Sequence, residues 1–128
     1  MYLERNFDVE SFLHNNDTDG LYPIQIDTLR NIEPILREYA NIQDYDKCLS
    51  ITTDYYGSEV IRVIFSYNKW MNNYLILEND GNAVATFFTQ NGGVPEGKVT
   101  IRCPCHHKDF MHFAKRFFEV SLTNKGGL

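Results

Sequence analysis

The side chains best suited to chemistry gather in one short string, Cys103-Pro104-Cys105-His106-His107. Thiolate and imidazole groups suit zinc, and a zinc site takes about four such ligands from at least two places in the chain. Cys48 and His112 could complete such a set. A structural zinc site usually shows two paired knuckles, however, and this sequence has one irregular cluster. We therefore expect no bound metal or other cofactor, with a metal centre built from these cysteines and histidines as the alternative.

The same thiols could instead act as nucleophiles or redox groups. Cys105 and His112 form a possible Cys-His pair, but such a pair also needs an orienting acid and an oxyanion site. No motif in the sequence marks either of these. Cys103 shares with Val99 and Ile101 the strand face that is predicted to point to the core, and an unpaired cysteine is among the residues most often buried. We expect no catalytic residues, and a small thiol- or metal-dependent protein or enzyme is the alternative.

The same corner is the most basic short segment of the chain, with Arg102, His106, His107 and Lys108. These residues precede a predicted helix, whose first N–H groups and dipole favour negative charge. An anion site is therefore a further alternative. The sequence pI of about 5.3 does not show the basic balance of a nucleic-acid-binding domain, so direct binding of nucleic acid is not expected.

Two aromatic turns carry the prediction of a binding surface. The connection around residues 66–74 contains the single tryptophan of the sequence, and the connection around residues 54–59 contains a tyrosine pair. Tryptophan, tyrosine and methionine are enriched at protein interfaces and hot spots. The predicted partner-binding residues are Tyr55, Tyr56, Tyr67, Lys69, Trp70 and Met71. The alternative is that Trp70 folds back over an open edge of the core.

The periodicity of the apolar residues predicts the elements that hold these turns and this corner. Alternation predicts strands over 47–55, 59–67, 73–78, 83–89 and 98–103, with a tight turn at Asp80-Gly81 and a loop over 92–97. Helical spacing predicts a helix over about 32–42, with Asn31 as N-cap and Pro34 in its first turn, after an extended piece over 22–26. One extra turn before residue 32 is the alternative. A second helix is predicted over about 107–122, with Met111 and Phe118 at the margins of its apolar stripe.

Together these elements predict one α+β domain over residues 1–128. Its architecture is a two-layer sandwich, with a five-stranded, mostly antiparallel meander and two helices on one face of the sheet.

Charge and cysteine content bound the function. The formal net charge is −5, and it is uneven along the chain, since residues 1–60 hold most of the acidic groups. Three cysteines in a chain of 128 residues do not make a disulfide framework, which favours a reducing compartment such as a bacterial or infected-host cytosol. No apolar run is long enough to span a membrane, and no membrane contact is expected.

These features are typical of small acidic inhibitors, immunity proteins and virus-encoded regulators. We therefore expect a protein-binding module whose partner is another protein with a basic surface, such as a nuclease or other nucleic-acid-binding protein. A structural subunit of a virion or complex is the remaining alternative. The oligomeric state stays open.

Overall fold

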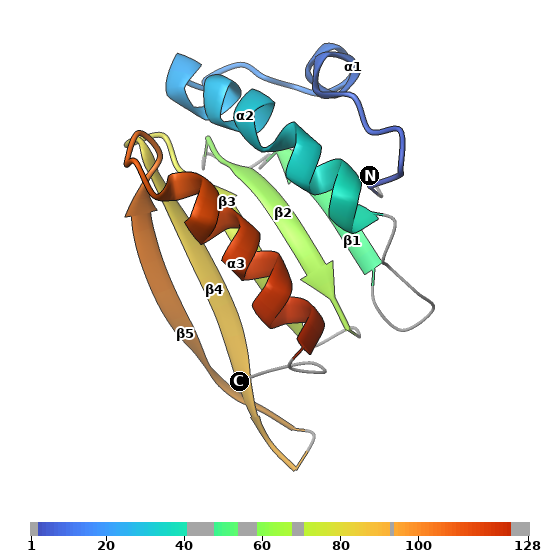
Figure 1. Cartoon of the computed structure of the whole chain (residues 1–128), viewed down its shortest axis with the longest axis vertical. Helices are drawn as coiled ribbons and strands as arrows, with labels where there is room; N and C mark the ends of the chain where they lie inside the picture. The colour runs from blue at the N-terminus through green and yellow to red at the C-terminus, as the bar shows by residue number, and fades with distance from the viewer. Residues whose placement is uncertain (1–2, 41–47, 54–58, 68–70, 93, 124–128) are drawn as a thin grey trace.

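The computed structural model describes residues 3–40, 48–53, 59–67, 71–92 and 94–123. In this part of the chain the sheet has five antiparallel strands whose order in space is their order in the sequence. The helices form a layer over one face of this sheet (Figure 1). The α+β meander predicted from the sequence is confirmed. The elements are α1 (Val9–Asn15), α2 (Pro23–Ala40), β1 (Cys48–Thr53), β2 (Ile61–Ser66), β3 (Asn72–Leu77), β4 (Asn82–Asn91), β5 (Val94–Pro104) and α3 (Phe110–Thr123).

The short helix α1 was not predicted, because only seven residues carry its pattern. Its N-cap is Asp8, whose carboxylate accepts hydrogen bonds from the backbone N–H and the hydroxyl of Ser11. These hydrogen bonds lower the pKa of the Asp8 carboxyl group. The buried side chains Val9 and Phe12 then hold α1 against the rest of the core.

The helix α2 begins nine residues before the predicted start, so the extended piece over 22–26 and the Asn31 cap are both wrong. Its start is fixed by Tyr22, whose backbone N–H donates to the Gln25 side chain at 2.7 Å, and by Pro23, which suits a first helical position. Pro34 therefore lies inside the helix, on its exposed side. There, water can hydrate the carbonyl that loses its hydrogen bond, and burial of the opposite face offsets the cost.

The hairpins of the sheet follow the turn chemistry, with one correction. At the Asp80-Gly81 turn, Gly81 has a φ of 88° and the Glu78 N–H donates to the Asn82 carbonyl, as predicted. The predicted loop over 92–97 is wrong from residue 94 onward, because β5 already begins at Val94. Gly92, with a φ of 60°, turns the chain there, and a register shift at Thr89/Gln90 absorbs one extra residue of β5.

The core lies between the helices and the near face of the sheet. Tyr39 of α2 and Phe118 of α3 stack with ring centroids 5.0 Å apart, so the two helices are joined through the core. Phe118 is fully buried, and its predicted place at the margin of the stripe is wrong, because α2 covers that side of α3. The helix α3 begins at Phe110 instead of about 107, since residues 105–109 form hydrogen-bonded turns.

None of the helices in the described ranges is both long enough and apolar enough to cross a lipid bilayer.

Candidate interaction surfaces

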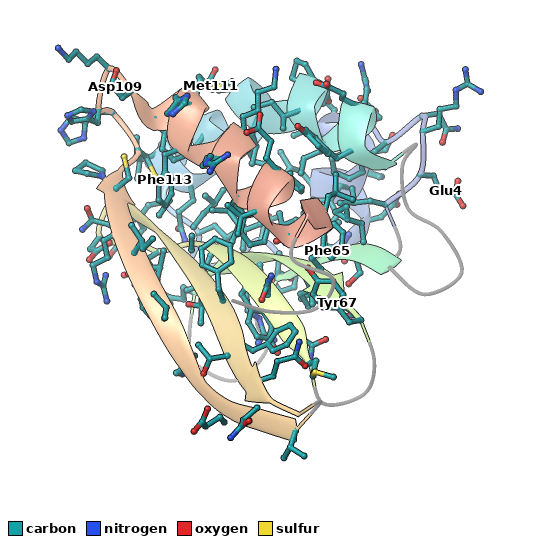
Figure 2. The ribbon with its side chains drawn as sticks, turned by 60° about the horizontal axis from the view of Figure 1, so that its bottom comes forward. Glu4, Phe65, Tyr67, Asp109, Met111 and Phe113 are labelled. Atoms are coloured by element: carbon teal, nitrogen blue, oxygen red, sulfur yellow. The ribbon has the colours of Figure 1, made fainter. Side chains whose placement is uncertain are left out.

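The structure places the two described residues of the predicted aromatic site, Tyr67 and Met71, at the end of β2 and beside it. The Tyr67 hydroxyl donates to the Ser121 carbonyl of α3, and its ring packs against Phe65 and Phe88 at centroid distances of 5.2 and 5.3 Å (Figure 2). Burial raises the pKa of Tyr67 to about 12. Met71 is half-buried, and its carbonyl accepts from the Tyr67 N–H. Tyr67 thus joins the end of β2 to α3, while Lys69, Trp70, Tyr55 and Tyr56 lie outside the described residues.

The cysteine–histidine corner does not converge on one point. The Cys105 backbone N–H donates to the Gly81 carbonyl, which fixes the chain beside the β3–β4 hairpin, whereas His106, His107 and His112 are exposed. Among the residues that the structure describes, no group of three potential ligands could hold a metal ion. The backbone of Cys48 lies on β1, at the opposite edge of the sheet from Cys103 on β5.

The thiols at this corner are held in their protonated form. Partial burial raises the pKa of both Cys103 and Cys105, and the nearby Asp109 carboxylate raises the Cys103 value further. Because the thiolate is the nucleophile and the metal ligand, a raised pKa weakens both of the chemical readings of this cluster.

Acidic side chains also lie at the predicted anion site. The Arg102 guanidinium donates to the Glu78 carboxylate at 2.5 Å, and the Asp109 N–H donates to Nδ1 of His107 at 3.1 Å. Asp109 itself stands directly before α3, so a negative charge is already present near the start of this helix. The basic corner therefore already contains acidic side chains, those of Glu78 and Asp109. They lie among its four basic residues, which are Arg102, His106, His107 and Lys108.

A groove between the sheet edge and α3 was missed by the sequence reasoning. It encloses about 210 Å³, and its lining is mostly apolar. Figure 2 labels Phe113, whose ring comes from the side of α3 that borders this space. We call it the β5–α3 groove, and its lining residues are Ala85, Phe87, Ile101, Phe113, Arg116, Phe117 and Val120.

The outer wall of this groove is the helix-side face of β5. Val99 and Ile101 do lie on the face predicted for them, opposite Phe87 and Ala85 of β4. They are nevertheless 40% and 49% exposed, so their predicted burial is wrong. The physical reason is lateral coverage, because the helix layer reaches β4 and leaves the last strand of the sheet largely uncovered (Figure 1).

A second surface gathers acidic side chains around the start of α2. Glu10 of α1 and Asp27 of α2 both contact Arg30, and the Asp17 carboxylate accepts from the Asp19 N–H. Gly20 lies so close to Glu59 that a Cβ on it would meet Oε1 at 2.6 Å. We call this the acidic surface; its exposed members are Glu10, Asp17, Asp19, Asp27 and Glu59.

Tyr22 stands beside the acidic surface and is 52% exposed. Its backbone is fixed by the Gln25 contact, so the ring is presented from a rigid position at the start of α2. The sequence reasoning did not predict that the Tyr22 ring is exposed. The available signal was an aromatic residue directly after the polar turn stretch 15–20 and directly before Pro23.

The uneven charge of the sequence can be assigned to particular elements of the fold. Because strand order follows chain order, β1 lies at one edge of the sheet and β5 lies at the other, while α2 crosses the sheet between them (Figure 1). The start of α2 contacts the corner after β5, where the Cys105 side chain hydrogen-bonds Thr28. Acidic groups dominate among residues 3–40, and basic groups are in slight excess over residues 82–122. The acidic excess therefore belongs to the part of the chain that holds α1 and α2, and the slight basic excess belongs to the part that holds β4, β5 and α3.

Comparison with protein-family models, with curated proteins and with solved structures finds no match for this chain.

Proposed function

We propose that this chain is a protein-binding module of the inhibitor or immunity type, whose acidic surface covers a basic surface on another protein. A nuclease or another nucleic-acid-binding protein has the required basic cleft, and the cytosol is the expected compartment. The observation that carries the proposal is the acidic surface with the exposed Tyr22 beside it.

Electrostatic complementarity supports this pairing. Complementary charge raises association rates and selects among partners, and its effect weakens as salt increases. The acidic surface has five carboxylates, and in the described part of the chain one guanidinium, that of Arg30, pairs with two of them, Glu10 and Asp27. Most of its negative charge is therefore available to a basic partner. Tyrosine is among the residues that most often contribute a binding hot spot, and Tyr22 supplies one next to these charges.

The acidic surface is held rigidly, and this makes it a better candidate for the binding site of an inhibitor than the cysteine–histidine corner. Gln25 ties the start of α2 to the segment before β2 and to the end of β3, through hydrogen bonds of 2.7 and 2.9 Å to the carbonyls of Glu59 and Leu77. A preformed surface loses less conformational entropy on binding. The thiols of the corner, in contrast, are kept protonated.

The test is calorimetric titration of a panel of purified basic nucleic-acid-binding proteins at two salt concentrations. We expect at least one partner, bound more weakly at higher salt, with Asp17→Asn/Asp19→Asn weakening it about tenfold or more. Asparagine can still accept the turn hydrogen bond, so this variant changes charge and leaves the backbone in place.

The control is Asp109→Asn/Glu119→Gln, which removes the same formal charge from residues outside the acidic surface. It should change the affinity less than about threefold. The proposal fails if no member of the panel binds, or if the two double variants weaken binding equally.

A further inference from the structure

The edge of the sheet at β5 is open along its whole length in the described structure. The strand has eleven residues, pairs with β4 on one side, and has no element beside it on the other (Figure 1). An exposed edge strand presents unpaired N–H and C=O groups that can pair with another strand. Pro95 and Pro104 lack an N–H, so the stretch from Glu96 to Cys103 is the part able to pair.

Apolar side chains accompany this open edge. Val94, Val99 and Ile101 are three of the most exposed large apolar residues in the described chain, at 64%, 40% and 49%. Val99 and Ile101 face the same side as the β5–α3 groove, and Ile101 forms part of its wall. Open backbone groups and exposed apolar side chains on one strand mark an interaction surface.

We propose that the occupant of this edge is a second copy of the chain, paired β5 to β5 in antiparallel fashion about a two-fold axis through Val99. Such an interface is isologous, so the same strand must be complementary to itself. The dimer would carry one continuous sheet, with the helices of both copies on the same face. This proposal does not depend on the proposed function, since it rests on the residues of β5 and uses none of the acidic surface.

The charges on β5 favour the register through Val99 over the neighbouring register through Thr100. Antiparallel partners face the same side of a sheet, so only registers that pair residues of equal parity keep Val99 and Ile101 on the helix side. With Val99 opposite its own copy, Glu96 faces Arg102 and Lys98 faces Thr100. With Thr100 opposite its own copy, Lys98 would face Arg102 twice, which places like charges together.

The register through Val99 also suits the other contacts of the strand. Ile101 faces Gly97, whose missing side chain leaves room for the isoleucine to cover the partner backbone. Arg102 already donates to Glu78, on the open face of the sheet, and in the dimer it would lie between two carboxylates. The β-bulge near Glu96 marks the end of the regular ladder, just where this register ends its pairing before Pro95.

The test is sedimentation or multi-angle light scattering at about 100 µM protein, where we expect a mass of two chains. Glu96→Arg should weaken the dimer about tenfold or more, because it places two guanidinium groups opposite each other at both ends of the pairing. Glu96→Arg/Arg102→Glu should restore the dimer to within about threefold of the original, because the charges are exchanged across the same contact.

Lys98→Glu is the matched control and separates the two registers. In the register through Val99, Lys98 faces Thr100, so the change should alter dimerisation less than about threefold. In the register through Thr100 it would instead strengthen the dimer. Thermal melts of each variant check that the fold is kept, which matters for Arg102→Glu because Glu78 is its neighbour.

A monomer at this concentration would overturn the proposal and leave the edge to a strand from a different protein. If Glu96→Arg leaves dimerisation unchanged, or if Glu96→Arg/Arg102→Glu does not restore it, the interface lies elsewhere. A dimer strengthened by Lys98→Glu would overturn the register. Loss of partner binding in the Asp17→Asn/Asp19→Asn variant bears on the acidic surface and leaves the mass of the dimer unchanged.

Discussion

The side-chain amide of Gln25 in α2 donates to the main-chain carbonyl of Leu77 at the end of β3, across 52 residues of sequence and a distance of 2.9 Å. The same amide donates to the Glu59 carbonyl at 2.7 Å, and its oxygen accepts from the Tyr22 N–H. One buried side chain therefore fixes the start of a helix and holds it against two strands. The acidic surface owes its geometry to this contact.

Replacing Gln25 with leucine should lower the free energy of unfolding by about 2–3 kcal/mol, because it leaves buried carbonyls without their donor. Chemical denaturation of the purified protein measures the change. Asn31→Ala, on the exposed side of the same helix, should stay within about 0.5 kcal/mol of the original. Equal losses in both variants would mean that the Gln25 contacts contribute little.

Replacing Pro34 with alanine should raise the free energy of unfolding by about 1–3 kcal/mol, since proline costs about 3 kcal/mol inside a helix and some of this is offset in the unfolded chain. The side chain is exposed, so no packing is lost. Thermal or denaturant unfolding checks the sign. A destabilised variant would show that the helix does not continue through this position.

Replacing Phe117 with alanine should cost about 3–5 kcal/mol, because its ring is 1% exposed and packs against Phe87 and Phe118. Phe65→Ala, equally buried, should behave alike. Met111→Ala on the same helix as Phe117 is the control, since its side chain is 43% exposed and should cost less than about 1 kcal/mol. Losses below about 1 kcal/mol at both phenylalanines would refute the assigned core.

Alkylation of Cys103 and Cys105 should reach half its maximal rate at a higher pH in the folded protein than in the denatured chain. The sign follows from the raised pKa of both thiols, because the folded state favours the protonated form and only the thiolate reacts. A Cys48→Ser background removes the third thiol.

Elemental analysis of the purified protein should find no stoichiometric zinc or iron. About one metal ion per chain, lost in Cys105→Ser, would restore the metal hypothesis.

When a protein partner has been identified, Trp70→Ala should weaken the binding of that partner at least about tenfold, because tryptophan is enriched at binding hot spots. The fold should stay intact, because Trp70 is predicted to lie in a strand connection. This prediction comes from the sequence and concerns a residue outside the described ranges. His106→Ala/His107→Ala should do much less. If the histidine variant abolishes binding and Trp70→Ala does not, the contact lies at the basic corner.

Local pattern was enough to predict most of the fold. Alternating apolar residues placed all five strands, the Asp80-Gly81 turn predicted its hairpin, and short connections predicted the antiparallel order. The error at α2 shows the limit of local rules. Pro34 argues against a helix when only its neighbours are considered, whereas burial of Leu29, Ile32 and Leu36 against the sheet decides in favour of one.

Exposure and the arrangement of surfaces depended on tertiary structure. The alternation that buries Phe87 on β4 continues through Val99 and Ile101 on β5, and the sequence alone determined which face they share. Only the fold decided that they stay exposed, because burial depends on how far the helix layer extends across the sheet. In the same way, the chain fixes the number of charges in each half, but only the fold decides that Thr28 of α2, beside Asp27, contacts Cys105 directly after β5.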